Sequence, residues 1–130
     1  MIAIVVTARP SYARIKTVLE GLDQLRAPFI LYVCASALHP KYGRVIDVIR
    51  RDGYDTVEVW ASCEHNVLVG GCLTTASLTS ALATLFARDK PAVVVTIADR
   101  KETLATAIAA SYQHIPLFHL LAGERSGSID

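Results

Sequence analysis

The stretch from Pro91 to Asp130 reads PAVVVTIADRKETLATAIAASYQHIPLFHLLAGERSGSID and decides the fold of this chain. Residues 92–97 form a continuous, mostly β-branched run, which predicts a strand buried on both faces of a parallel sheet. Residues 117–121 are apolar again and predict a second strand. Asp99 and the loop after the second strand then lie at the carboxyl ends of parallel strands, which is the edge where α/β sheets bind ligands.

A helix is predicted between these two strands, so that the stretch forms a strand–helix–strand unit. Asp99 can cap its first turn, and Glu102 stands three residues later, where the carboxylate of a capping box belongs. The apolar stripe of this amphipathic helix recurs at helical spacing and consists of Leu104, Ala107, Ile108, Ser111 and Tyr112.

The rest of the chain repeats the alternation of strands and helices. Further strands are predicted at 2–6, 29–33 and 57–60. Residues 61–75, with two adjacent glycines, are predicted to be a loop. Five strands alternating with helices predict an α/β fold with a doubly wound, Rossmann-like parallel sheet. The predicted helical stripes are Ile15, Val18, Leu19 and Leu22, then Tyr42, Val45, Ile46 and Ile49, then Leu78, Ala81, Leu82 and Leu85.

The composition indicates a cytoplasmic globular domain. Of the 130 residues, 52% are hydrophobic, which is ample for a buried core, and no apolar run approaches the length of a membrane span. The net charge of +1 gives no electrostatic case for nucleic acid or an anionic membrane. Cys34, Cys63 and Cys72 form no Cys-x-x-Cys pair, which favours reduced thiols. His114 and His119 lack metal-ligand spacing, so no metal or cofactor is expected.

Several short motifs together resemble one family. In the decisive stretch they are Asp99-Arg100-Lys101-Glu102-Thr103, His114-Ile115-Pro116, Ala122-Gly123-Glu124 and Gly127-Ser128-Ile129-Asp130. Nearer the N-terminus they are Thr7-Ala8-Arg9-Pro10-Ser11-Tyr12, Tyr42-Gly43 and Asp47-Val48-Ile49-Arg50-Arg51-Asp52-Gly53. These motifs resemble the hydrolysing UDP-N-acetylglucosamine 2-epimerases, including those that make N-acetylmannosamine for sialic-acid-type sugars. The likeness covers most of the chain except roughly residues 60–75.

The resemblance implies a fold, a reaction and a set of site residues. The fold is the N-terminal half of a GT-B-type enzyme, with residues 1–130 as its Rossmann-like domain and the C-terminal nucleotide-binding domain absent from this chain. The reaction converts UDP-GlcNAc and water to N-acetylmannosamine and UDP by elimination and then hydration. The implied partners are a nucleotide sugar and either a second copy or a separate C-terminal half. The implied catalytic residues are Asp99, Glu124 and Asp130, and the implied substrate contacts are Arg9, Arg100, Glu102, Arg125, Ser126 and Ser128.

Some of these roles also follow from position, and some have structural alternatives. Arg9 falls on the first strand-to-helix turn, where a guanidinium suits a diphosphate. Asp99 can be a plain helix cap, and Glu102 is better explained as the reciprocal cap. Glu124 can be structural. A histidine near an apolar strand, such as His119, is more often a satisfied core or surface residue than a ligand.

The chain also departs from the family pattern. Leu121 stands where much of the family has a polar residue and several branches have a catalytic glutamate, so one proton-transfer role is vacant or passes to Glu124. Lys101 replaces an aromatic residue. Because the second domain would supply much of the site, turnover by this chain alone is not expected.

Two alternatives to an enzyme domain remain open at this point. The first is a non-catalytic domain for sugar-nucleotide binding or assembly, which the leucine and the missing half favour. The second is a response-regulator-like or other small α/β domain. Residues 3–9 contain no Asp or Glu, so the acid cluster that such a domain needs after its first strand is missing.

Overall fold

In the residues that the structure describes, 1–61, 69–123 and 127 of a computed structural model, five parallel strands form one sheet. Their order across the sheet is β3-β2-β1-β4-β5. All five predicted strands are confirmed, because each differs from its predicted range by no more than one residue at either end. The strands are β1 (Ile2–Val6), β2 (Phe29–Cys34), β3 (Thr56–Val59), β4 (Val93–Ile97) and β5 (Leu117–Leu120).

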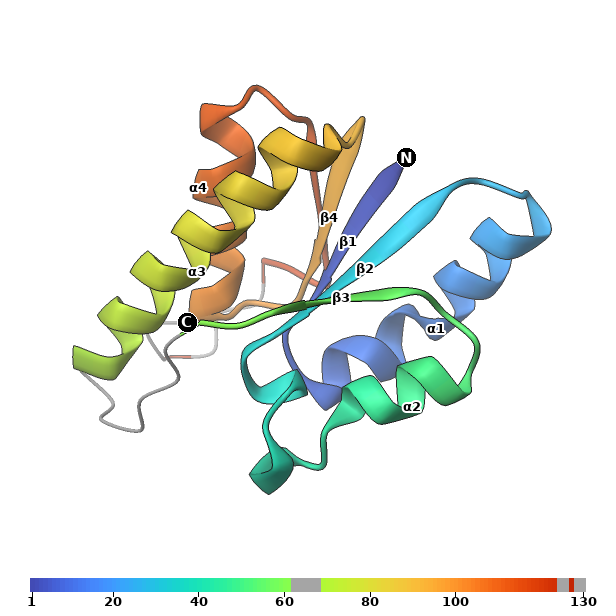
Figure 1. The fold of residues 1–130 in the computed structure, drawn as a ribbon, viewed down its shortest axis with the longest axis horizontal. Helices are drawn as coiled ribbons and strands as arrows, with labels where there is room; N and C mark the ends of the chain where they lie inside the picture. The colour runs from blue at the N-terminus through green and yellow to red at the C-terminus, as the bar shows by residue number, and fades with distance from the viewer. Residues whose placement is uncertain (62–68, 124–126, 128–130) are drawn as a thin grey trace.

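Four α-helices of the described chain cover the two faces of this sheet (Figure 1). One face carries α1 (Arg9–Gln24) and α2 (Val45–Arg51), and the other carries α3 (Val69–Asp89) and α4 (Lys101–Tyr112). Two short 3₁₀ turns, Ala35–Ala37 and Pro40–Tyr42, connect β2 to α2. Each helical layer has its own buried hydrophobic cluster against the sheet. The predicted Rossmann-like, doubly wound fold is therefore confirmed.

The chain reverses its direction of winding between β1 and β4. These two strands pair in parallel, with Ile4 opposite Val95, while β1 pairs with β2 on its other side. The loop after β1 leads into α1 on one face, and the loop after β4 leads into α4 on the other. Such a switch point leaves a crevice outside the carboxyl ends of the two strands, and ligands bind there in open α/β sheets.

The helix α3 begins earlier than the sequence predicts. It starts at Val69, so the expected loop over 61–75 is wrong for its last seven residues, while 62–68 lie outside the described residues. Its buried stripe recurs every four residues and consists of Gly70, Thr74, Leu78, Leu82 and Phe86. A Cβ built on Gly71 would come 3.9 Å from Lys101 Cδ, so this end of α3 runs close to the start of α4. Tertiary packing here overrides the local preference of two glycines for a loop.

By length and composition alone, α3 could also cross a membrane. The prediction that no apolar run approaches that length is therefore wrong. In the fold, however, α3 connects β3 to β4, which belong to the same sheet, and Leu78, Leu82 and Phe86 are buried in the cluster on its face. A helix that crosses over between parallel strands needs an apolar side for this packing. The packing of α3 on the sheet thus accounts for the apolar residues of its inner side.

The apolar stripe of α4 faces the opposite way from the one expected. Leu104 is 57% exposed and Tyr112 is 86% exposed, while the buried residues are Glu102, Ala105, Thr106, Ala109 and Ala110. Small side chains on the buried face allow α4 to lie close to α3 and to the sheet. The larger apolar side chains are left on the outer surface.

A hydrogen-bonded group joins α1 to the residue that follows α2. The Tyr12 hydroxyl donates to Asp52 Oδ2 at 2.5 Å, and Lys16 Nζ lies 2.9 Å from the same oxygen. The Tyr12 hydrogen bond, followed by that of Lys16, holds the pKa of Asp52 below its ordinary 3.8. Burial, and then the hydrogen bond to Asp52, raises the pKa of Tyr12. Both shifts favour a phenol donating to a carboxylate at neutral pH.

We expect Tyr12→Phe to lower the free energy of unfolding by an amount that depends on pH. Because the pKa of Asp52 is lowered in the folded state, its contribution is fully present above its ordinary value of 3.8 and is lost as the pH falls through the lowered pKa. The difference between wild type and variant should be constant from pH 6 to 8 and shrink below about pH 4. Urea unfolding at a series of pH values measures it. A difference that stays constant down to about pH 2 would contradict this assignment.

Candidate functional site

The candidate site lies at the carboxyl edge of the sheet, where the loops after β1 and β4 meet the switch point. The first loop leads to Arg9, the first residue of α1, and the second contains Asp99. Arg9 is exposed, and its Nη1 atom is 3.9 Å from the place that a Cβ on Gly43 would occupy. Gly43 itself has a φ of +83°, which a side chain would strain. The sequence prediction that both residues lie at this edge is confirmed.

Asp99 is paired with a residue that the sequence analysis dismissed. His119 Nε2 lies 2.9 Å from Asp99 Oδ1, so the end of β5 contacts the loop after β4. His119 is opposite Thr96 in the β4–β5 register, three residues before Asp99. Two predicted parallel strands with polar residues near their carboxyl ends were the signal that could have found this pair.

Glu102 is buried beneath the site and bound by the neighbouring arginine. The carboxylate is 2% exposed, and Arg100 approaches it with Nε at 3.1 Å and a second guanidinium nitrogen at 3.3 Å. The predicted capping box is wrong, because Arg100 is the N-cap residue of α4 and no side chain caps the helix there. Glu102 therefore lies in the first turn, where a carboxylate is favourable near the positive helix end.

The backbone that carries Asp99 is fastened on both sides. Ala98 has a φ of +64°, its N–H donates to Leu120 O at 2.9 Å, and its carbonyl accepts from Thr103 Oγ1 at 2.7 Å. The first bond extends the β4–β5 pairing beyond the end of the strand. Strained backbone of this kind persists only where its surroundings hold it. Thr103, which sequence reasoning gave no role, thus fixes the loop before Asp99.

Several predicted site residues lie outside the described residues, namely Glu124, Arg125, Ser126, Ser128 and Asp130. Leu121, just after β5, is described: it is 57% exposed and has a φ of +59°. Its side chain brings no carboxylate to this position. In the part of the chain that is described, no group of three His, Cys, Asp or Glu residues could hold a metal ion.

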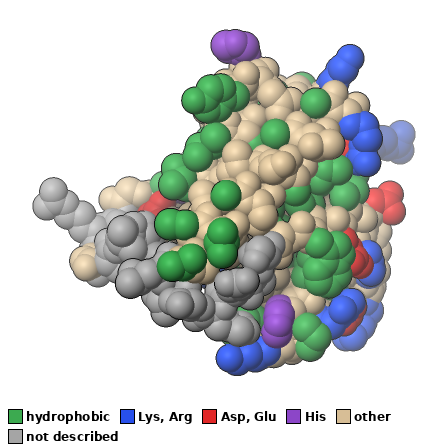
Figure 2. All heavy atoms as spheres, turned by 60° about the vertical axis from the view of Figure 1, so that its left-hand side comes forward, with side chains coloured by type: hydrophobic (Ala, Val, Ile, Leu, Met, Phe, Trp, Pro, Cys, Tyr) green, Lys and Arg blue, Asp and Glu red, His purple; other side chains and the backbone are tan. Residues whose placement is uncertain are grey.

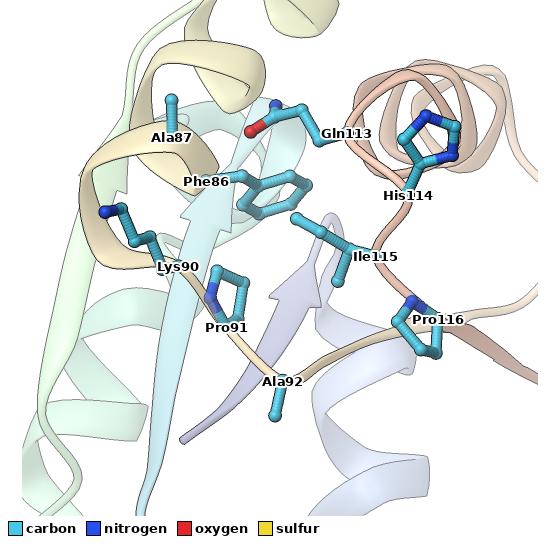
Figure 3. A pocket seen from close by; sticks show the side chains of 9 residues that line it. All are labelled: Phe86, Ala87, Lys90, Pro91, Ala92, Gln113, His114, Ile115 and Pro116. Carbon is cyan, nitrogen blue, oxygen red and sulfur yellow. The ribbon is translucent and has the colours of Figure 1, made fainter.

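Open grooves at the opposite, amino edge of the sheet do not coincide with this site. One of about 550 Å³ lies where α3 and α4 end, and Figure 3 shows Phe86 and Ile115 facing each other in its middle. Another, of about 420 Å³, lies between the ends of α1 and α2 and includes Arg26 and Asp55. Neither groove contains any of the predicted site residues.

Comparison with known proteins shows which family the chain belongs to. The profile of the family described as UDP-N-acetylglucosamine 2-epimerase matches residues 11–130. The chain belongs to this family. A relative from Legionella pneumophila, named UDP-N,N'-diacetylbacillosamine 2-epimerase (hydrolyzing), is 30% identical over 131 residues. That match covers 94% of this chain and 33% of the relative, so the chain spans about a third of the relative's length.

Solved structures of UDP-N-acetylglucosamine 2-epimerases share the fold. The enzyme from Neisseria meningitidis, bound to UDP-GlcNAc, superposes with a TM-score of 0.79 at 21% identity, over 98% of this chain and 34% of its own. MnaA of S. aureus, in a structure with UDP, gives 0.78 at 21% identity, over 98% and 32%. The enzyme from Methanocaldococcus jannaschii gives 0.74 at 19% identity, over 98% and 33%. The predicted family and the predicted Rossmann-like domain fold are both confirmed.

We expect Arg100→Met to destabilise the fold because it leaves the buried carboxylate of Glu102 without its partner. The loss should be about 1 kcal/mol, a modest value because Arg100 is partly exposed to solvent. In a Glu102→Gln background the same substitution should cost much less, and the double-mutant cycle by urea unfolding measures the coupling. Lys101→Met, next in the chain and exposed, is the matched control. Equal losses in both backgrounds would show that the ion pair does not stabilise this edge.

Proposed function

We propose that residues 1–130 are the N-terminal domain of a hydrolysing UDP-N-acetylglucosamine 2-epimerase and hold the sugar half of UDP-GlcNAc. The observation that carries the proposal is that a cation, Arg9 at the start of α1, and a carboxylate, Asp99 in the loop after β4, both lie at the carboxyl edge beside the switch point. Both residues belong to the motifs that resemble the family. Further support comes from relatives, since one is named as hydrolyzing and two solved neighbours carry UDP-GlcNAc or UDP.

In the proposed reaction a base removes the proton from C2 of the sugar while UDP leaves from C1, which gives a C1–C2 double bond. Water then adds its oxygen to C1, and a proton returns to C2 on the other face. Asp99, with Glu124 and Asp130, is proposed to move these protons. Arg9, Arg100 and Arg125 would offset the charge of the diphosphate, while Glu102, Ser126 and Ser128 complete the proposed substrate contacts.

The same proposal predicts binding by this chain without turnover. The chain spans about a third of the length of its relatives, and groups from the rest of the enzyme would have to complete the site. Leu121 removes a further possible proton carrier from this edge. A cytoplasmic location is part of the proposal and is supported by Cys72, an exposed cysteine that forms no disulfide within the described residues.

The first test is an NMR titration of the 130-residue chain with UDP-GlcNAc, followed by a search for UDP and N-acetylmannosamine in the same tube. We expect shifts around Arg9 and Asp99 without product. Arg9→Ala should weaken binding about tenfold, the value of one charge-assisted hydrogen bond to phosphate. Arg26→Ala, in the groove at the opposite edge, is the matched control and should bind like the wild type. Unchanged binding by Arg9→Ala would remove this residue from the site, and product formation would refute inactivity.

A second candidate function, assembly, is favoured by the outer surface of α3 and α4. In the sequence, α3 has no charged residue from Val69 to Ala87, and α4 has none from Thr103 to Tyr112. Hydrophobic side chains are spread along this face in Figure 2, and the exposed ones include Val69, Leu73, Leu104 and Tyr112. The outward face of a helix in a monomeric protein normally carries charges. We propose that two copies of the chain pair through this face.

Light scattering at high protein concentration tests the pairing. The wild type should have the mass of two chains, and Leu104→Lys combined with Tyr112→Lys should have the mass of one, because two buried ammonium groups would oppose association. Leu25→Lys is the control, since Leu25 is 78% exposed at the end of α1, on the other side of the sheet. A wild type that remains monomeric would refute the pairing while leaving the sugar-nucleotide site unaffected.

A further inference from the structure

The ring of His119 joins the last described strand to the loop that carries the proposed base. Its Nε2 atom is 2.9 Å from Asp99 Oδ1, and its side chain is 26% exposed against 38% for Asp99. Among the hydrogen bonds of the described residues, Asp99 Oδ2 takes part in none. One oxygen of this carboxylate is therefore held by His119, and the other has no hydrogen bond to any described residue.

The second ring nitrogen determines which tautomer this contact requires. His119 Nδ1 is buried and has no hydrogen-bond partner within the described part of the chain. With the hydrogen on Nε2, the ring donates to Asp99 and leaves only a lone pair at Nδ1. With the hydrogen on Nδ1, a buried N–H would lack an acceptor and the Nε2 lone pair would face a carboxylate oxygen. The geometry favours the Nε2–H tautomer.

The surrounding backbone holds donor and acceptor at a fixed separation. The Ala98 N–H donates to Leu120 O at 2.9 Å, which ties the residue before Asp99 to the residue after His119. The Thr103 hydroxyl binds the carbonyl of Ala98 at 2.7 Å from the first turn of α4. The His119–Asp99 contact is thus built into the end of the β4–β5 ladder.

We propose that His119 is a positioning residue for Asp99. Its Nε2–H binds Oδ1 and so fixes the direction in which Oδ2 faces a bound sugar nucleotide. This inference rests on the proposed function, in which Asp99 contacts the sugar. The sequence pattern had assigned His119 no role. A group that orients a catalytic carboxylate contributes by pre-organising the geometry in which the proton is transferred.

The test combines a spectroscopic signature with binding of UDP-GlcNAc to the 130-residue chain. Long-range ¹H–¹⁵N spectra of the wild type should show the Nε2–H tautomer of His119, with a ring proton that exchanges faster with water in Asp99→Leu. His119→Leu should bind UDP-GlcNAc about fivefold more weakly, because the released Asp99 carboxylate would have to be ordered when the ligand binds. His119→Gln, whose amide can donate from nearly the same position, should bind within about twofold of the wild type.

His114→Leu is the matched control, because it removes a histidine at the opposite edge of the sheet and should not change binding. Urea unfolding of each variant checks that it is folded. An Nδ1–H tautomer, or wild-type affinity in a folded His119→Leu variant, would overturn the positioning role and leave the proposed function intact. No binding of UDP-GlcNAc by the wild type would overturn the proposed function, and with it the role of His119 in presenting Asp99 to a sugar.

Discussion

Burial of β1 between the two helical layers is the constraint on which the rest of the structure depends. Its residues Ala3, Ile4, Val5 and Val6 are fully buried, and it pairs with β2 on one side and β4 on the other. A strand in this position must be apolar on both faces, so it contributes no chemistry of its own. The polar residues that could contact a ligand lie instead after the end of β1 and in the loop after β4. The central pairing therefore decides which polar residues can meet.

At the carboxyl edge of the sheet, the loops are positioned by a few hydrogen bonds and an ion pair, which together contribute much less stability than the packing of the core. The bond from Ala98 N–H to Leu120 O extends the ladder, and the His119 ring reaches Asp99 from the same strand. Beneath them, the pairing of Arg100 with Glu102 neutralises a carboxylate that would otherwise be buried alone. Each contact restricts one loop, and together they hold the backbone on both sides of Asp99.

The positions of the strands could be predicted well from the sequence. Which side of each helix is buried could be predicted less well. A β-branched run such as 93–97 has few alternatives to a buried strand, whereas Gly70 and Gly71 are compatible with a loop or with a closely packed helix. The sequence could place Asp99 and Arg9 at the carboxyl edge of the sheet, because each residue follows a recognisable strand. The contact between Asp99 and His119 was not predicted, because it depends on the register of β4 against β5. For Glu102, the side chain that binds it is Arg100, two residues away, and capping rules do not predict that pair.

The outward stripe of α4 shows why periodicity alone cannot place a helix. Spacing identifies the apolar residues that share a side, but it does not say whether that side meets the core. In α4, small residues face inward and let the helix lie close to α3 and the sheet, namely Ala105, Thr106, Ala109 and Ala110. Leu104 and Tyr112, which hydropathy alone would bury, remain outside. A helix with small residues on its inward side and apolar residues on its outward side cannot be oriented from spacing, because both sides recur at helical intervals.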